Sequence, residues 1–157
     1  MNIFYLDRDI EKNVQYHCDK HVVKMILESA QLLSSVHHMT NEVPPLSVYK
    51  LTHKNHPCAI WARSSLANYE YLFALTVLLN DEYRFRYSKK FDHKSMSIVQ
   101  DMPIPNLPDL PFTEPPKCVH DDFKDIDDVV DAYRAYYKRD KASFCTWTNR
   151  EIPEWFR

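Results

Sequence analysis

The chain of 157 residues contains no glycine. Glycine is the residue that reaches left-handed backbone conformations without steric cost and lets a backbone come close to a ligand. Its absence excludes the P-loop and the dinucleotide-binding fingerprint, because both motifs need glycine at fixed positions. Any phosphate group bound by this chain must therefore be held by side chains or by helix N-termini.

Apolar residues recur at helical spacing along most of the sequence. No segment alternates between apolar and polar residues as a strand does. Asp19 either caps a second helix or lies inside a single helix that continues from the first. The helical stretch 56–87 can be broken into two helices at Ser64–Ser65. The first expected helix begins at about Ile10 and is capped by Asp9, and the helical region that follows ends near His38. Further helices are expected across 56–87 and across 126–144. The sequence thus predicts an all-α, compact single domain of four to five helices over residues 1–157.

Two connecting segments are expected to lack helix. Asn41–Pro45 is predicted to be a loop because of its asparagine and paired prolines. Residues 102–116 carry six prolines, so we expect an extended, surface-hugging loop that covers 102–120. The aromatic tail TWTNREIPEWFR is expected to pack against the rest of the protein.

Net charge is −2, which is not typical of a nucleic-acid binder. Six aspartates and one lysine lie in 121–131, however, and the rest of the chain is slightly positive, which allows a basic face. No apolar run has the length of about 18 residues that a membrane span needs. The start resembles no signal peptide, and the four cysteines form no C-x-x-C pair, so we expect reduced thiols and a cytoplasmic location.

One helix face carries a row of polar side chains among apolar neighbours. His21, Lys24 and Glu28 lie on the same side of the helix at about 100° per residue, and Gln31 extends the row. One interpretation is a solvated edge with a lysine–glutamate pair. The other is the wall of a cleft, in which histidine and glutamate act as acid and base.

A metal site is a further interpretation of the same region. His17 and His21 are four residues apart, which lets two imidazoles share one ion, and Cys18 lies between them in sequence. A third ligand would come from one of four residues, Glu28, His37, His38 or His56. The preferred interpretation has no metal and no cofactor.

Two other segments suit contact with phosphate. His56 precedes Pro57 at a predicted helix N-terminus, where Lys54 and free N–H groups can hold an anion, or where His56 simply caps the helix. Near the C-terminus, tyrosines are followed by basic residues, a pattern that suits base stacking and phosphate contact. It equally suits a core helix whose basic end reaches into solvent. These residues are Tyr133, Tyr136, Tyr137, Lys138, Arg139 and Lys141.

Four blocks occur in a distinctive order. They are Asp19, His21 and Glu28 on one helix; Asn55–His56–Pro57 opening a helix that runs to Glu82, Tyr83 and Phe85; Tyr133, Tyr136, Tyr137 and Lys141; and the apolar start MNIFYL. Together they resemble the pyrimidine-dimer DNA glycosylase family of the phage endonuclease V type. The matches cover about half of the chain, and the order of the blocks and the spacing from His21 to Glu28 carry the resemblance.

The resemblance implies a compact all-α enzyme that cuts the N-glycosidic bond of a damaged base and then nicks the strand. In that family the N-terminal α-amine attacks the sugar C1′ to form a Schiff base, and β-elimination follows. By matching position, Glu28 is the acid–base residue and the amine of Met1 is the nucleophile, with Lys24 as the alternative amine. An α-amine is partly neutral at pH 7, and a neighbouring carboxylate stabilises positive charge on the sugar.

The resemblance also implies DNA as the partner of a phage protein that works in the host cytoplasm. His21 would hold the DNA backbone or orient the glutamate. The residues expected to contact DNA or substrate are Asn2, His21, Gln31, Lys54, His56, Arg63, Tyr136, Lys138 and Lys141. Two other functions stay open: a glycosidase or hydrolase that acts on nucleotides or modified bases on the same fold, and a non-catalytic phage protein that binds a host factor.

Overall fold

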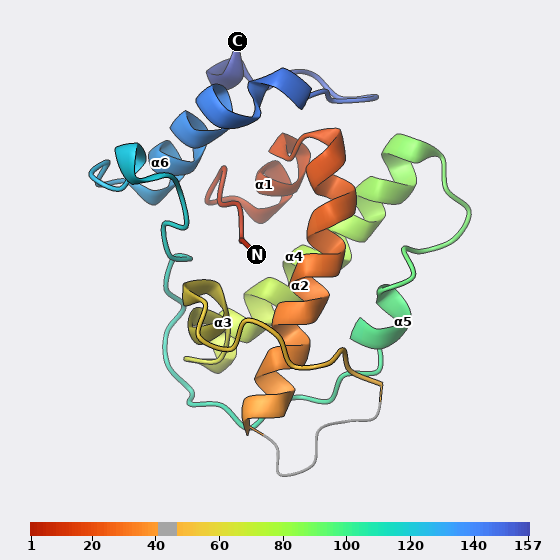
Figure 1. Cartoon of the computed structure of the whole chain (residues 1–157). Coiled ribbons are helices and arrows are strands. Elements are labelled where there is room, and N and C mark those ends of the chain that lie inside the picture. Colours follow the sequence, from red (N-terminus) through yellow and green to blue (C-terminus); the bar gives the residue numbers. More distant parts are fainter. Residues whose placement is uncertain (41–46) are drawn as a thin grey trace.

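The computed structural model describes residues 1–40 and 47–157. In these ranges the chain forms six α-helices and no β-strand, so the predicted all-α, compact single domain is confirmed (Figure 1). The predicted loop Asn41–Pro45 lies outside the described residues. The helices are α1 (Ile10–Tyr16), α2 (Asp19–Thr40), α3 (Pro57–Ala62), α4 (Leu66–Tyr87), α5 (Met96–Val99) and α6 (Val129–Tyr136).

The boundary between α1 and α2 follows from local hydrogen bonding. Asp9 caps α1 as predicted, since its carboxylate accepts the N–H groups of Glu11 and Lys12 at 2.9 and 3.0 Å. The backbone turns extended at His17, where ψ is 131°, so α2 starts as a separate helix. Within the described residues α2 reaches Thr40, slightly beyond the predicted end.

Helices α2 and α4 form the centre of the fold. Each has 22 residues, a length of about 33 Å, and they lie side by side through the molecule (Figure 1). The N-terminal segment runs into the core between α2, α3 and α6 (Figure 1). The largest side chains buried here include Ile3, Leu6, Met25, Ile26, Leu32, Leu33, Leu72, Leu75 and Leu79. The start of the chain is therefore part of the core, which fixes the position of its first residues.

The predicted division of 56–87 is confirmed. Pro57 occupies the first turn of α3, and the Nδ1 atom of His56 accepts the N–H of Cys58 at 3.2 Å, which caps the helix. After the turn at Arg63, Ser65 caps α4 by accepting the N–H of Asn68 at 3.1 Å.

Left-handed backbone positions fall on other residues because glycine is absent. His53, Ser88 and Asn149 have φ values of 50°, 49° and 58°. Ser88 follows the last turn of α4, a place where glycine is usual. Each such position costs about 1–2 kcal/mol in a residue with a side chain, so tertiary contacts must hold these turns.

The proline-rich segment is an extended loop without helix or strand over 102–118, as expected. Backbone groups of α4 and the loop pair directly, since the N–H of Leu66 donates to the carbonyl of Pro108 at 2.9 Å. Trp61 donates its indole N–H to the carbonyl of Thr113 at 3.0 Å, and Asn68 accepts the N–H of Thr113 at 2.9 Å. These bonds hold the loop against α3 and α4.

The C-terminal part differs in detail from the prediction. The expected helix across 126–144 begins only at Val129, because Asp128 caps α6, and it continues as a π-helical turn (Tyr137–Lys141) and a 3₁₀ turn (Ala142–Phe144). The sequence did not predict α5. The aromatic tail packs down as expected, with the rings of Trp147 and Phe156 4.7 Å apart. Among the described residues, no helix combines the length and apolar character needed to cross a membrane.

Candidate functional site

Glu28 lies between two amines. Its Oε1 atom is 3.2 Å from the Nζ atom of Lys24, one turn earlier on α2. Its Oε2 atom is 3.8 Å from the α-amine of Met1 and accepts the backbone N–H of Asn2 at 3.1 Å. The carboxylate side chain is 13% exposed, whereas that of Lys24 is 61% exposed. The structure thus brings together the three residues that sequence analysis assigned to catalysis.

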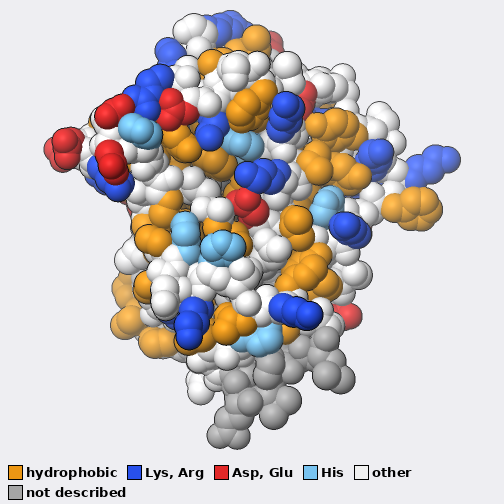
Figure 2. Space-filling model, in the orientation of Figure 1, with side chains coloured by type: hydrophobic (Ala, Val, Ile, Leu, Met, Phe, Trp, Pro, Cys, Tyr) orange, Lys and Arg blue, Asp and Glu red, His pale blue; other side chains and the backbone are white. Residues whose placement is uncertain are grey.

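The face that carries the N-terminus combines charged and histidine side chains. Near the middle of this face an acidic side chain lies close to lysine or arginine and to histidine side chains (Figure 2). Hydrophobic side chains lie between these polar groups, and further lysine and arginine side chains surround them (Figure 2). This face of the molecule therefore offers both positive charge and apolar surface.

Tyr133 anchors the residue next to the amine. Its hydroxyl lies 2.9 Å from Oδ1 of Asn2 and 2.7 Å from the carbonyl of Pro116, and it accepts the N–H of Cys118 at 3.2 Å. Asn2 also donates its side-chain N–H to the carbonyl of Cys118 at 2.9 Å. These bonds tie the N-terminus to α6 and to the end of the proline-rich loop, so the amine is held beside Glu28.

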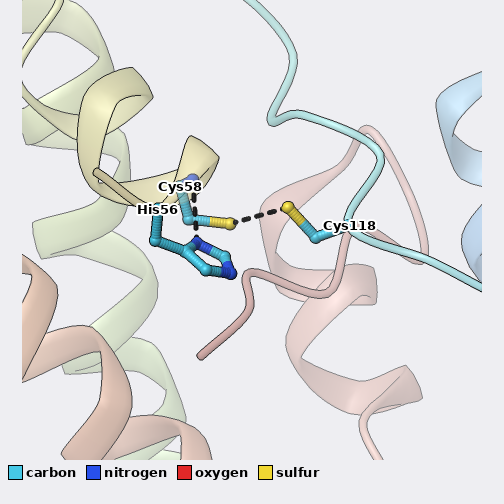
Figure 3. A group of neighbouring side chains, drawn as sticks. All are labelled: His56, Cys58 and Cys118. Carbon is cyan, nitrogen blue, oxygen red and sulfur yellow. Dashed lines mark hydrogen bonds between the residues drawn. The ribbon is translucent and has the colours of Figure 1, made fainter. Parts of the chain in front are cut away.

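A histidine and two cysteines lie next to this amine. The sulfur atoms of Cys58 and Cys118 are 3.5 Å apart, and His56 lies against Cys58 (Figure 3). Burial, the charge of the N-terminal amine and His53 lower the pKa of His56, while the carboxylate of Glu28 acts in the opposite direction. His56 thus lies within the electrostatic influence of the amine and Glu28, and its Nδ1 atom caps α3, as the second interpretation of this residue expected.

His21 has different surroundings from those expected of a DNA-contacting residue. It is 4% exposed, its ring stacks on Phe4 with 4.3 Å between centroids, and its Nδ1 atom lies 2.5 Å from the hydroxyl of Tyr137. Phe144 packs against the ring edge at 5.6 Å. Contact with a DNA backbone would require the ring to leave this stack, so the geometry favours a role in holding the N-terminal segment.

The other predicted DNA-contacting residues lie at or near the surface. Lys54 and Lys138 are exposed, Gln31 is half-buried, and Arg63 donates to the carbonyl of Lys54 at 2.7 Å. The ammonium of Lys141 lies 4.6 Å from the centre of the Tyr136 ring. Basic groups therefore remain accessible on the surface.

The predicted alternative of a metal bound by His17 and His21 has no third ligand in place. His17 is buried and its Nδ1 atom lies 2.7 Å from the carbonyl of Asn13, while His21 pairs with Tyr137. Of the proposed third ligands, Glu28 pairs with amines, and His37 and His38 bond to Tyr69 and to the carbonyl of Tyr49. In the described part of the chain, the group with metal-binding geometry is His56, Cys58 and Cys118.

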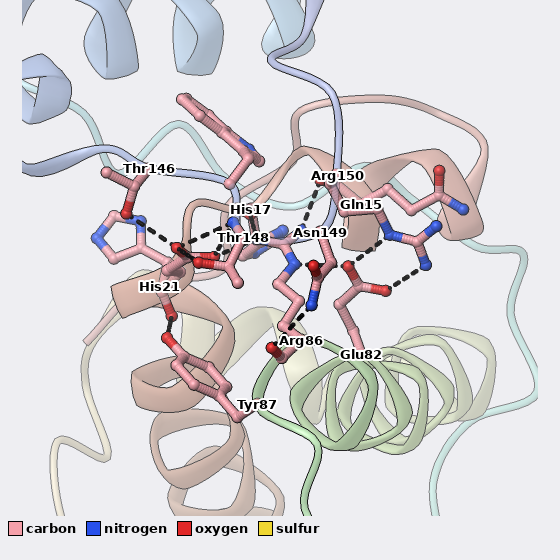
Figure 4. Close-up of polar contacts among 12 residues, drawn as sticks. Gln15, His17, His21, Glu82, Arg86, Tyr87, Thr146, Thr148, Asn149 and Arg150 are labelled. Carbon is pink, nitrogen blue, oxygen red and sulfur yellow. Dashed lines mark hydrogen bonds and ion pairs between the residues drawn. The ribbon is translucent and has the colours of Figure 1, made fainter.

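Sequence analysis missed the buried arginine that fixes the start of α2. The side chain of Arg86 is fully buried, and its Nε atom donates to Oε1 of Glu82 at 2.6 Å. Its Nη1 atom donates to the carbonyl of His17 at 2.8 Å and to Asp19 at 3.1 Å, and Nη2 donates to the carbonyl of Gln15 at 2.8 Å (Figure 4). Arg86 thus joins α4 to the junction between α1 and α2.

The C-terminal tail completes this network. The Asp19 carboxylate accepts the hydroxyls of Thr146 and Thr148 at 2.9 and 2.8 Å and the N–H of Thr148 at 2.9 Å. Arg150 donates to both oxygens of Glu82 at 2.9 and 2.8 Å (Figure 4). Burial raises the pKa of Asp19, but the bonds from Thr148, Thr146 and Arg86 outweigh it and leave this pKa below its ordinary value.

Replacing Arg86 by methionine should strongly destabilise the protein. The variant keeps much of the side-chain volume but leaves Asp19 and Glu82 without their shared cation, so we expect a loss of about 3–5 kcal/mol in the free energy of unfolding. Urea unfolding measures this loss. As a control, Arg84→Met removes an exposed partner of Asp92 at 3.4 Å and should cost less than about 1 kcal/mol. Equal losses in both variants would contradict the role assigned to the network.

Stability should fall in mild acid because His17 is buried in its neutral form. Burial lowers the pKa of His17 to about 3, with Asn13 opposing and with His21 and Arg86 adding to the shift. In the unfolded chain the imidazole of His17 binds a proton near pH 6.5. The contribution of neutral His17 to the free energy of unfolding is therefore fully present above that pH and is lost as the pH falls toward 3. The lowered pKa of Asp19 acts in the same direction at lower pH.

Urea unfolding between pH 8 and pH 4 tests this expectation. His17→Gln should reduce the slope of unfolding free energy against pH by about 1.4 kcal/mol per pH unit below pH 6, the value for one proton. His53→Gln, at an exposed histidine, is the matched control and should leave the slope unchanged. An unaltered slope in the His17 variant would show that this residue does not set the acid sensitivity.

No family model, curated protein or solved structure matches this chain. The geometry of the residues around Glu28 therefore carries the functional argument.

Proposed function

We propose that this protein is a DNA N-glycosylase with an associated AP-lyase activity, acting on damaged or modified pyrimidines through an amine Schiff base. One observation carries the proposal. The carboxylate of Glu28 lies 3.8 Å from the α-amine of Met1 and 3.2 Å from the amine of Lys24. An amine beside a half-buried carboxylate is the pair that this chemistry needs.

The reaction uses these groups in sequence. The neutral amine nitrogen bonds to C1′ as the bond between C1′ and the base breaks, and the departing base takes a proton from water. The nitrogen now bonded to the sugar then gives up one of its own protons. Glu28 stabilises the positive charge that develops on the sugar and accepts the amine proton. Glu28 returns its proton to the ring oxygen as the sugar ring opens to a Schiff base. Loss of a C2′ proton then breaks the C3′–O bond, and water finally releases the amine.

The amine of Met1 is the better placed of the two nucleophiles. Asn2, whose N–H also bonds to Glu28, is held by Tyr133 and by the carbonyl of Cys118, so the first residues have a fixed position. The side chain of Lys24 is 61% exposed, so fewer protein contacts hold its amine in place. A fixed nucleophile loses less entropy on reaching the transition state.

Accessible basic residues support DNA as the substrate. Lys54 and Lys138 are exposed, and Tyr136 with Lys141 offers a ring and a cation together. The acidic cluster 121–131 is partly neutralised, because Asp122 pairs with Arg139 and Asp128 pairs with Arg8. Binding through such contacts releases counterions and should weaken steeply with added salt.

Borohydride trapping tests the proposal. Protein whose N-terminal residue has been established by mass spectrometry is incubated with ultraviolet-damaged, abasic and undamaged duplexes in the presence of borohydride, which reduces a Schiff base to a stable adduct. We expect an adduct with abasic DNA that peptide mapping places at Met1. Glu28→Gln should slow its formation by about 10²–10⁴-fold, whereas Glu70→Gln, at an exposed glutamate of α4, should not.

Lysine variants separate the two amines. If Met1 is the nucleophile, Lys24→Met retains adduct formation, as does the control Lys20→Met, and blocking the α-amine abolishes it. Absence of an adduct and of strand cleavage on all duplexes would refute the proposal. Base release from free nucleosides without DNA affinity would instead indicate a nucleotide glycosidase, and binding of a partner unaffected by Glu28→Gln would indicate a non-catalytic protein.

A further inference from the structure

His56, Cys58 and Cys118 converge on one point beside the N-terminus. Each offers one ligand atom, and these atoms lie within 4.8 Å of one another. His56 and Cys58 come from the start of α3, and Cys118 comes from the end of the proline-rich loop (Figure 3). We propose that these three side chains bind one Zn²⁺ ion and leave its fourth coordination position for water or substrate.

The distance between the sulfur atoms fits a shared zinc ion. Thiolates bind zinc at about 2.3 Å, so two of them on one tetrahedral ion lie about 3.8 Å apart. The sulfur atoms of Cys58 and Cys118 are 3.5 Å apart, which needs only a small adjustment. A disulfide bond of about 2.05 Å would require a much larger approach and would not use the imidazole.

The imidazole of His56 changes its hydrogen bonding when it binds a metal. Its Nδ1 atom accepts the N–H of Cys58 at 3.2 Å in the cap of α3 (Figure 3). In the neutral ring the proton then lies on Nε2. Coordination of a metal at Nε2 requires the other tautomer, in which the proton lies on Nδ1 and the bond from the N–H of Cys58 is given up.

Backbone N–H groups point toward both sulfur atoms. The backbone N–H of Ile3 faces Cys58, and that of Cys58 faces Cys118. Hydrogen bonds to ligand atoms of this kind orient and stabilise a bound metal.

Three protein ligands with one open position are typical of catalytic rather than structural zinc. Glu28 and the α-amine lie close enough to His56 to act on its imidazole electrostatically. A water on the metal could there exchange for an oxygen or nitrogen atom of a substrate. The inference goes beyond the proposed glycosylase activity and does not rest on it.

Metal analysis and cobalt substitution test the proposal. Untagged protein purified without chelator should contain about one equivalent of zinc by mass spectrometry. Protein stripped by a chelator and titrated with Co²⁺ should develop the thiolate-to-cobalt charge-transfer absorption, and Zn²⁺ should displace it. Cys118→Ser and His56→Gln should each weaken Zn²⁺ binding by about 100-fold or more.

Matched controls use a cysteine and a histidine outside the group. Cys145→Ser and His53→Asn should leave zinc content and the cobalt absorption unchanged; asparagine tolerates the positive φ of 50° at position 53. Circular dichroism of each variant separates loss of ligand from loss of fold, and cobalt absorption retained at full strength in Cys118→Ser would overturn the proposal.

Two further results would also overturn it. One is protein without zinc that develops no thiolate-to-cobalt absorption. The other is a Cys58–Cys118 disulfide found by peptide mapping after alkylation, which would indicate a redox pair instead. Because these measurements need no DNA, their outcome is independent of the trapping experiment.

Discussion

The structure depends on the buried guanidinium of Arg86. Its contacts with Glu82, Asp19 and the carbonyls of Gln15 and His17 connect α4 with the start of α2. A buried cation is costly to remove from water, so such a side chain is stable only when every donor has a partner. This one interaction therefore fixes where α1 ends and α2 begins, and through Asp19 it also holds the C-terminal tail.

The position of the candidate site follows from that junction. Once the first turn of α2 is fixed, Glu28 projects toward the place where the N-terminal segment enters the core. Phe4 stacks on His21 of the same helix, and Tyr133 of α6 holds Asn2. The amine is thus placed by buried contacts on both sides, although the site itself is partly exposed. This arrangement resembles a functional site supported by a rigid scaffold.

Patterns of neighbouring residues in the sequence predicted the fold, but they did not predict contacts between segments far apart in the chain. Caps at Asp9, the division before Ser65 and the proline-rich loop follow from residue chemistry within a few positions. The pair of Lys24 and Glu28 follows from helical spacing. In the sequence, Arg86 is one basic residue among several, and no pattern indicates that it is buried. Cys58 and Cys118 are 60 residues apart, and this spacing does not indicate that their thiols meet. Such contacts depend on how loops return to the core.

The amine site and the proposed zinc site are electrostatically compatible. Two thiolates cancel the double positive charge of Zn²⁺, so the zinc complex with a neutral imidazole has no net charge. Without the metal, the three side chains are neutral and also carry no net charge. Metal binding would therefore leave the field around Glu28 and the α-amine largely as it is. A site with three carboxylates would instead add negative charge and favour the protonated, unreactive amine. The thiol and imidazole ligands at Cys58, Cys118 and His56 thus allow a metal to lie next to a nucleophilic amine without suppressing it.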